Sequence, residues 1–178
     1  VRSAPRTVQI VLAAGRSERM GSPKPLLDFG GRTALRLALD AAAGAGVPES
    51  VVVVGKNAPE VMAAHDARHL PLGVRWVKNE EEGSEQLRSL QLGLAACRGE
   101  GFDGFFIHPV DHPLATSADY GLLLEAFSSA HEGGERDASG ARDASATVFI
   151  PSHGGRRGHP ILCRWPVAEK ILTLGTKD

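Results

Sequence analysis

A loop with three cationic side chains follows a hydrophobic run near the amino terminus. The run is 7–11, Thr-Val-Gln-Ile-Val, and the loop is 12–27, Leu-Ala-Ala-Gly-Arg-Ser-Glu-Arg-Met-Gly-Ser-Pro-Lys-Pro-Leu-Leu. Small residues let backbone N–H groups approach an anion closely. Arg16, Arg19 and Lys24 supply positive charge that neutralises a polyphosphate. A loop of this composition at the end of a strand predicts a phosphate-binding site.

The loop differs from two common phosphate-binding motifs. It lacks the Lys-Ser/Thr ending of a P-loop and the G-x-G-x-x-G spacing of a dinucleotide-binding turn. A dehydrogenase would also need an acidic residue at the end of the second predicted strand, where Lys56 stands. An ATPase or an oxidoreductase is therefore not the expected function.

The loop resembles the signature L-A-[AG]-G-x-[SG]-x-R-M-G-x-x-K-x-L of nucleotidyltransferases with the MobA-like fold. An ordinary basic strand-to-helix turn explains one Gly and one Lys but not the whole string. The resemblance implies that Arg19 and Lys24 are catalytic, because they offset charge as pyrophosphate leaves. It also implies that the loop binds the nucleotide through Leu12, Ala13, Ala14, Gly15, Arg16, Ser17 and Lys24.

A carboxylate follows a second hydrophobic run. Residues 104–108 predict a buried strand, and Asp111 comes just after it. Open α/β sheets place ligands at the carboxyl ends of strands, so Asp111 should meet the first loop there. Asp111 resembles the family's metal-binding Asp-x-Pro, which makes it the candidate Mg²⁺ ligand, with phosphates and waters completing the site. The alternative is an Asx-turn residue that shapes the loop. His108 and His112 flank Asp111 without a recognised zinc arrangement.

Residues 79–94 form a polar stretch that runs into an amphipathic helical pattern. The stretch is similar to the family's Asn…Gly…Ser-Leu-x-x-Gly-Leu. The resemblance places Asn79 and Ser89 at the nucleotide and implies that Gly93 packs closely against the first loop. A capped surface helix is the alternative.

Residues 151–162, Pro-Ser-His-Gly-Gly-Arg-Arg-Gly-His-Pro-Ile-Leu, are rich in turn formers. The Arg-Gly-His-Pro string is similar to a signature of the molybdenum cofactor cytidylyltransferase branch. The resemblance implies that Arg157, Gly158 and His159 bind the acceptor, and guanidinium groups suit its phosphate. The alternative for His159 is a structural role through a backbone hydrogen bond.

Apolar runs alternate with stretches of helical period, which predicts an α/β protein with three layers and a mostly parallel sheet. The resemblance adds that this sheet is Rossmann-like, of the nucleotide-diphospho-sugar transferase type. We expect strands at 7–12, 50–55, 74–78, 104–108, 146–150 and 159–163. We expect helices at 33–45 with Thr33 as N-cap, 58–67, 86–97, 117–130 and 166–174. The segment 132–145 repeats Arg-Asp-Ala-Ser and predicts a mobile surface loop.

Length and composition indicate one domain, 1–178, with 42% hydrophobic residues. The 20 Lys and Arg balance 21 Asp and Glu, so neither nucleic acid nor an anionic membrane is an expected partner. No apolar run reaches the ~18 residues of a membrane helix, and the first residues show no export signal, which predicts a cytoplasmic protein. Cys97 and Cys163 lack metal-ligand spacing, which predicts buried thiols.

Together these features predict a Mg²⁺-dependent transfer of a nucleoside monophosphate from an NTP to an acceptor phosphate. By the resemblance, Ala14 with Gly158-His159-Pro160 indicates CTP and molybdopterin cofactor, with a molybdoenzyme or chaperone as a possible partner. A sugar-phosphate or isoprenoid-precursor nucleotidyltransferase is the alternative enzyme. A non-catalytic nucleotide-binding or cofactor-chaperone domain is the third hypothesis, because the family's C-terminal Asp-x-Asp-x-Pro-x-Asp motif is absent from the 178 residues.

Overall fold

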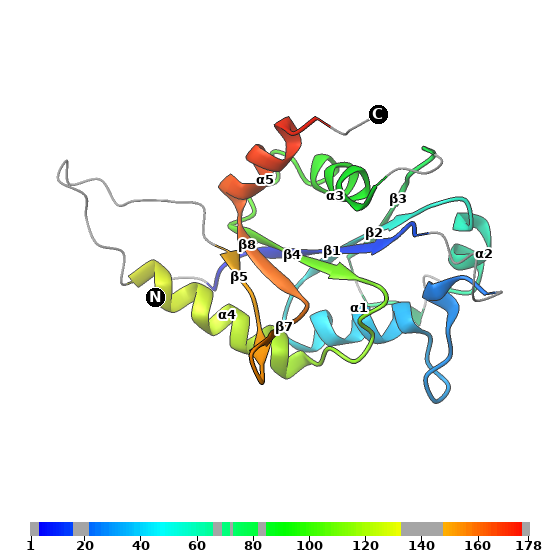
Figure 1. The fold of residues 1–178 in the computed structure, drawn as a ribbon, viewed down its shortest axis with the longest axis horizontal. Helices are drawn as coiled ribbons and strands as arrows, with labels where there is room; N and C mark the ends of the chain where they lie inside the picture. Colours follow the sequence, from blue (N-terminus) through cyan, green and yellow to red (C-terminus); the bar gives the residue numbers. More distant parts are fainter. Residues whose placement is uncertain are drawn as a thin grey trace.

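The computed structural model describes residues 4–15, 22–65, 69–71, 73–81, 85–132 and 148–175. Within these residues, a six-stranded sheet has the order β3-β2-β1-β4-β8-β5 (Figure 1). Its parallel strands are β1 (Thr7–Ala13), β2 (Glu49–Val54), β3 (Val74–Lys78) and β4 (Gly104–Pro109). Strand β8 (Ile161–Arg164) runs antiparallel to both β4 and β5 (Val148–Phe149).

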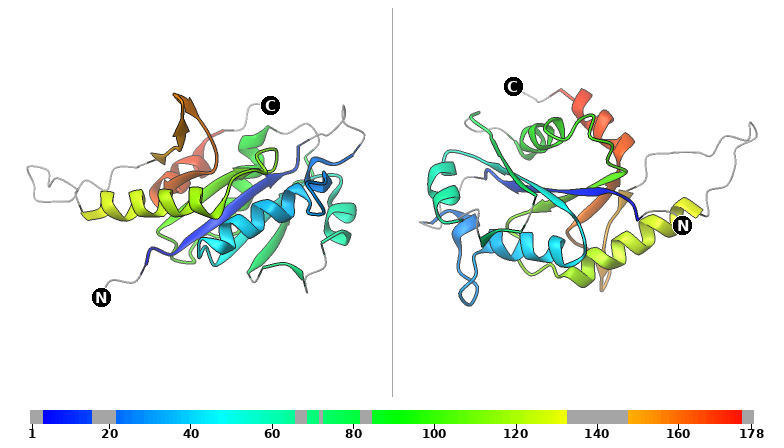
Figure 2. Two further views of the ribbon diagram at one scale, coloured as in Figure 1. Left: turned by 90° about the horizontal axis from the view of Figure 1, so that it is seen from below. Right: turned by 180° about the vertical axis from the view of Figure 1, so that it is seen from behind.

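Helices cover both faces of the sheet (Figure 1; Figure 2). One face packs against α1 (Ala34–Gly44) and α4 (Ser117–Glu132), and the other against α3 (Gln86–Ala95) and α5 (Trp165–Thr173). The short helix α2 (Ala58–Ala63) follows β2, and the 3-10 turn η1 (Lys24–Leu26) lies near the end of the first loop. This arrangement confirms the expected three-layer α/β fold with a mostly parallel sheet.

The side chains of each central strand point alternately to the two faces of the sheet, so the hydrophobic core has one part under each helical layer. On β1, Ile10 and Leu12 pack in the cluster that contains Leu94 of α3. Val11, between them, packs in the cluster that contains Leu35 of α1. Successive side chains of a strand point to opposite faces, so a central strand needs apolar residues at nearly every position.

Most predicted elements lie within a few residues of their observed bounds. Thr33 caps α1 as expected, since its Oγ1 accepts a hydrogen bond from the Arg36 amide at 3.1 Å. The prediction of 58–67 for α2 was too long. His65 Nδ1 lies 2.7 Å from the Val61 carbonyl oxygen, which the backbone amide of His65 would bond in a continuing helix. The His65 amide donates to the Met62 carbonyl at 3.1 Å instead, and the helix ends before this residue.

The segment before β8 differs from the prediction. A short hairpin forms from β6 (Ser152–His153) and β7 (Arg156–Arg157), joined by Gly154 and Gly155 with φ of 56° and 76°. Two positive φ angles match the tight turns of hairpins. The strand predicted at 159–163 begins at Ile161, because Pro160 has no N–H to give to the ladder. The loop predicted at 132–145 lies, except for Glu132, outside the described residues.

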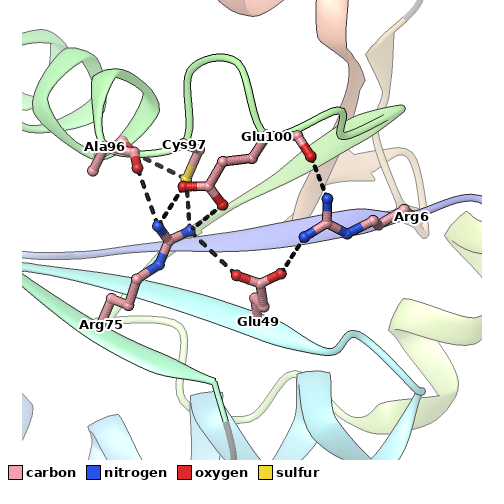
Figure 3. A network of polar contacts seen from close by, with 7 residues as sticks. Arg6, Glu49, Arg75, Ala96, Cys97 and Glu100 are labelled. Atoms are coloured by element: carbon pink, nitrogen blue, oxygen red, sulfur yellow. Dashed lines mark hydrogen bonds and ion pairs between the residues drawn. The ribbon is translucent and has the colours of Figure 1, made fainter.

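An ion-pair network joins three elements at the amino end of the sheet (Figure 3). The Arg75 guanidinium on β3 donates to the Glu100 carboxylate at 2.6 and 3.1 Å and to the Ala96 carbonyl at 3.1 Å. Glu49, which begins β2, lies 3.3 Å from Arg75 and 2.6 Å from Arg6. The hydrogen bond to Glu100 is the main cause of a raised Arg75 pKa. The network therefore ties the carboxyl end of α3 to β2 and β3.

Both cysteines are buried thiols, as the sequence predicts. Burial raises the pKa of Cys97 to about 11 and that of Cys163 to about 12. A nucleophilic cysteine needs a lowered pKa, so neither residue has the character of a catalytic thiol.

None of the helices in the described part of the chain has the length and apolar character that crossing a membrane requires.

Candidate active site

A cleft of about 770 Å³ lies at the carboxyl ends of the parallel strands. Its walls come from the loops after β1, β2 and β4, from the end of β3 and from the start of α3. The residues that line it include Leu12, Ala13, Ala14, Gly15, Lys24, Gly55, Lys56, Lys78, Asn79, Glu80, Glu81, Gln86, Ser89 and Asp111. The cleft thus contains every predicted nucleotide-binding residue except Arg16 and Ser17, which lie, like Arg19, outside the described residues.

Lys24 and Asp111 meet in this cleft. Lys24 Nζ lies 3.4 Å from Asp111 Oδ2, although the two residues belong to different loops. The loops are joined directly, since the Val110 amide donates to the Leu12 carbonyl at 3.1 Å. The two side chains are 35% and 47% exposed, so both remain open to a ligand. The expectation that the two strand ends meet at one edge is confirmed.

Asn79 and Ser89 form a second polar pair in the cleft. Asn79 Nδ2 donates to Ser89 Oγ at 2.9 Å, and Asn79 Oδ1 accepts from the Glu81 amide at 3.1 Å. Each residue is 5% exposed. These contacts fix the orientation of the Asn79 amide, because only its oxygen can accept from a backbone N–H. The start of α3 therefore presents a preorganised polar surface to the cleft.

The predicted contact of Gly93 with the first loop is wrong. A Cβ atom at Gly93 would lie 2.6 Å from Ile10 Cγ2 and 3.1 Å from Val53 Cγ2, so this glycine lets α3 approach β1 and β2. The glycine that lies close to the first loop is Gly55. A Cβ atom there would lie 2.8 Å from the carbonyl oxygen of Ala14.

Sequence reasoning did not include two lysines and a glutamine that line the cleft. Lys56 follows β2, Lys78 ends β3, and Gln86 begins α3. The rule that ligands bind at the carboxyl ends of parallel strands was a signal for both lysines. Gln86 carried no such signal, because its exposure to the cleft depends on the angle at which α3 enters.

The residues predicted to bind the acceptor are not among the described residues that line this cleft, and of the three it is His159 that is connected to Asp111, through His112. His159 stacks on His112 with ring centroids 4.4 Å apart, and His112 Nε2 lies 3.9 Å from Asp111 Oδ1. Burial and the neighbouring His112 lower the pKa of His159. Arg157 is exposed on β7, and the Gly158 amide donates to the Pro151 carbonyl at 2.8 Å. Because β8 runs antiparallel to β4, its amino end lies at the same edge of the sheet as the loop that carries Asp111.

The family can be assigned from the sequence profile. The profile of the MobA-like NTP transferase domain matches residues 9–178. The bifunctional protein GlmU of Corynebacterium aurimucosum is 36% identical over 152 residues, which are 83% of this chain and 29% of that protein. The 2-C-methyl-D-erythritol 4-phosphate cytidylyltransferase of Nocardia farcinica is 32% identical over 119 residues, 66% of this chain and 49% of the enzyme. The chain therefore spans less than half the length of these relatives.

Solved structures agree with this assignment. Rv0371c from Mycobacterium tuberculosis H37Rv is 26% identical with a TM-score of 0.71, over 97% of this chain and 78% of that chain. A nucleotidyl transferase from Methanothermobacter, Mth528, is 26% identical with a TM-score of 0.69, over 95% of this chain and 76% of that chain. The sequence profile, the fold and the loop at the end of β1 agree, and the chain belongs to the MobA-like NTP transferase family.

Proposed function

We propose that this chain transfers a nucleoside monophosphate from an NTP to a phosphorylated acceptor. An acceptor phosphate oxygen attacks the α-phosphorus, the bond from that phosphorus to the bridging oxygen breaks, and pyrophosphate leaves. The observation that carries the proposal is the Lys24–Asp111 pair, 3.4 Å apart in a cleft lined by the first loop. Such a reaction needs positioned charge rather than a protein nucleophile.

The residues of the cleft fit a Mg²⁺ ion. Among the described residues, no group of three or more His, Cys, Asp or Glu side chains is arranged to hold a metal. Asp111 offers a half-exposed carboxylate 3.4 Å from Lys24 of the first loop. Mg²⁺ accepts such a donor set when substrate phosphates and waters complete its shell. When bound, the ion would supply positive charge to the phosphate oxygens.

The other roles follow from the family resemblance. Lys24 and Arg19 neutralise the triphosphate as charge develops on pyrophosphate. Asn79 and Ser89, with Leu12 to Gly15, hold the nucleoside, and Arg157, Gly158 and His159 meet the acceptor. The stacking of His159 on His112, which lies beside Asp111, supports this last assignment.

We propose CTP as the donor and molybdopterin cofactor as the acceptor, in a cytoplasmic reaction. Ala14 in the first loop and Gly158-His159-Pro160 support this choice by resemblance. The Nocardia relative is also named a cytidylyltransferase, which supports CTP. Its named substrate, 2-C-methyl-D-erythritol 4-phosphate, provides the second candidate acceptor for this chain.

The test is pyrophosphate release by the purified protein with each of four NTPs and each acceptor in turn, at fixed Mg²⁺. We expect release with CTP and molybdopterin. Release only with 2-C-methyl-D-erythritol 4-phosphate would support the second candidate. Nucleotide binding without release under all conditions would contradict transfer and favour a non-catalytic nucleotide-binding domain.

A further inference from the structure

His108 is buried on β4, three positions before Asp111, and has no exposed surface. Its Nε2 lies 3.0 Å from the carbonyl oxygen of His112. Its Nδ1 lies 2.7 Å from Tyr120 Oη on α4. The imidazole therefore connects the Asp111 loop to the helical layer beneath the sheet.

The network continues across the sheet to α1 and β2. Gln9 Nε2 donates to Tyr120 Oη at 2.6 Å and to the Ala38 carbonyl at 3.0 Å. Ser50 Oγ donates to Gln9 Oε1 at 2.7 Å. The side chains of Gln9, Ser50, His108 and Tyr120 in this network are all buried.

The direction of each hydrogen bond can be assigned. A carbonyl oxygen only accepts, so Nε2 of His108 carries the proton given to His112. The neutral ring then accepts at Nδ1 from the Tyr120 hydroxyl, which in turn accepts from the Gln9 amide. Gln9 Nε2 makes its two shorter contacts with Tyr120 and Ala38 and also lies 3.3 Å from His108 Nδ1, so its amide cannot rotate without losing these contacts. The tautomer and orientation of His108 are thus determined by its surroundings.

The loop that carries Asp111 is held at the residue before it and at the residue after it. The Val110 amide donates to the Leu12 carbonyl at 3.1 Å, and the His112 carbonyl accepts from His108 at 3.0 Å. Asp111 is the residue between these two anchored positions, and its side chain lines the cleft.

We infer that His108 is a positioning residue, which holds the Asp111 carboxylate at the metal side of the cleft through its bond to the His112 carbonyl. This inference rests on the proposed function of Asp111. The buried N–H of the ring needs an acceptor, and the acceptor that it finds is the carbonyl of the residue directly after Asp111. Groups behind a metal ligand usually affect metal affinity or activity by about 10–100-fold when they are removed.

Two amide substitutions separate positioning from packing. In His108→Gln the side-chain nitrogen takes the place of Nε2 and can still donate to the His112 carbonyl. In His108→Asn the amide oxygen can take the place of Nδ1 and accept from the Tyr120 hydroxyl, but the shorter side chain has no donor within reach of the His112 carbonyl. Phe127→Leu, a buried change on α4, serves as the control for lost stability.

The measurements are the Kd of Mn²⁺ in the presence of CTP, by electron paramagnetic resonance, and kcat and KM for pyrophosphate release. We expect His108→Asn to raise the Mn²⁺ Kd and lower kcat by about tenfold each, with KM for CTP nearly unchanged. His108→Gln should stay close to wild type, and so should Phe127→Leu.

Equal Mn²⁺ affinity in His108→Asn and Phe127→Leu would overturn the inference and leave a role in packing. Equal loss in His108→Gln and His108→Asn would also contradict it, because only the Asn variant lacks the bond to His112. If the wild type binds Mn²⁺ but releases no pyrophosphate, the proposed transfer fails while the affinities still decide the role of His108. A wild type that binds no Mn²⁺ with CTP would overturn both.

Discussion

Lys24 contributes a charge at the cleft and little to the core, since 35% of its side chain is exposed. We expect Lys24→Ala to lower the rate of pyrophosphate release by about a hundredfold or more, as for loss of one preorganised charge at a transition state. Its circular dichroism and thermal unfolding should match wild type. Lys170→Ala, an exposed position on α5, is the matched control and should keep full activity. Normal turnover in Lys24→Ala would contradict the assignment of the first loop.

Asp111 is the single carboxylate assigned to the metal. Asp111→Asn keeps the size of the side chain but removes its charge, so Mg²⁺-dependent activity should be lost while binding of the NTP only weakens. The check is a titration of activity with Mg²⁺, paired with calorimetry of CTP binding. Full activity at ordinary Mg²⁺ concentration would show that the metal is held by other residues.

Ala14 lines the cleft, and its carbonyl oxygen is in close contact with Gly55, so the backbone there has little room to move. We expect its methyl group to favour CTP over GTP by about 1–3 kcal/mol, a range typical of one methyl in a pocket. Competitive pyrophosphate release with equal CTP and GTP measures this preference. Ala14→Gly should shift use toward GTP. Equal use of both nucleotides by the wild type would exclude a cytidylyl preference.

At the scale of elements, the position of α3 depends on how closely it packs on the sheet. Gly93→Ala places a methyl group 2.6 Å from Ile10 Cγ2, so α3 must shift, and we expect a loss of about 1–3 kcal/mol in the free energy of unfolding. Gly121→Ala on α4 is the control, because a Cβ atom there meets no atom within 4 Å. That change should stabilise the protein by about 0.5–1 kcal/mol, since Ala favours a helix more than Gly does. Urea unfolding of both variants distinguishes these outcomes.

Elements with strong local signals were predictable from sequence. Strand β3 has its predicted bounds, and the Thr33 cap needed only the residue types around it. The meeting of Lys24 and Asp111 followed from the rule about strand ends. The end of α2 could not be predicted from sequence, because it depends on the ring of His65. The Nε2 atom of that ring lies 2.7 Å from Thr33 Oγ1, which belongs to a segment distant in the chain. The partner of Gly93 was likewise decided by tertiary packing.

At the scale of the whole molecule, the buried His108 makes stability depend on pH. Burial is the main cause that lowers its pKa to about 4, against contributions from the His112 carbonyl and Asp111 that raise it. The unfolded chain binds this proton near pH 6.5, whereas the folded chain binds it only near 4. Stability is therefore complete above pH 6.5 and is lost as the pH falls toward 4, by about 3 kcal/mol for this group.

Urea unfolding at several pH values between 4 and 7.5 measures this dependence. The wild type should lose stability more steeply with acid than His108→Gln, which has no titrating group at that position. Parallel pH profiles for the two proteins would show that His108 does not titrate differently in the folded and unfolded chains.

Because β8 is antiparallel to β4, the residues at this edge of the sheet come from two separate parts of the chain. The Lys24–Asp111 pair and the Asn79–Ser89 pair belong to residues 7–111, whereas His159 reaches the same edge from a segment that starts beyond residue 148. Replacement of residues 150–160 by the equivalent segment of a relative would leave both pairs in place. With the roles proposed above, acceptor choice could evolve by exchange of one short stretch, while the residues proposed to bind the nucleotide are inherited unchanged.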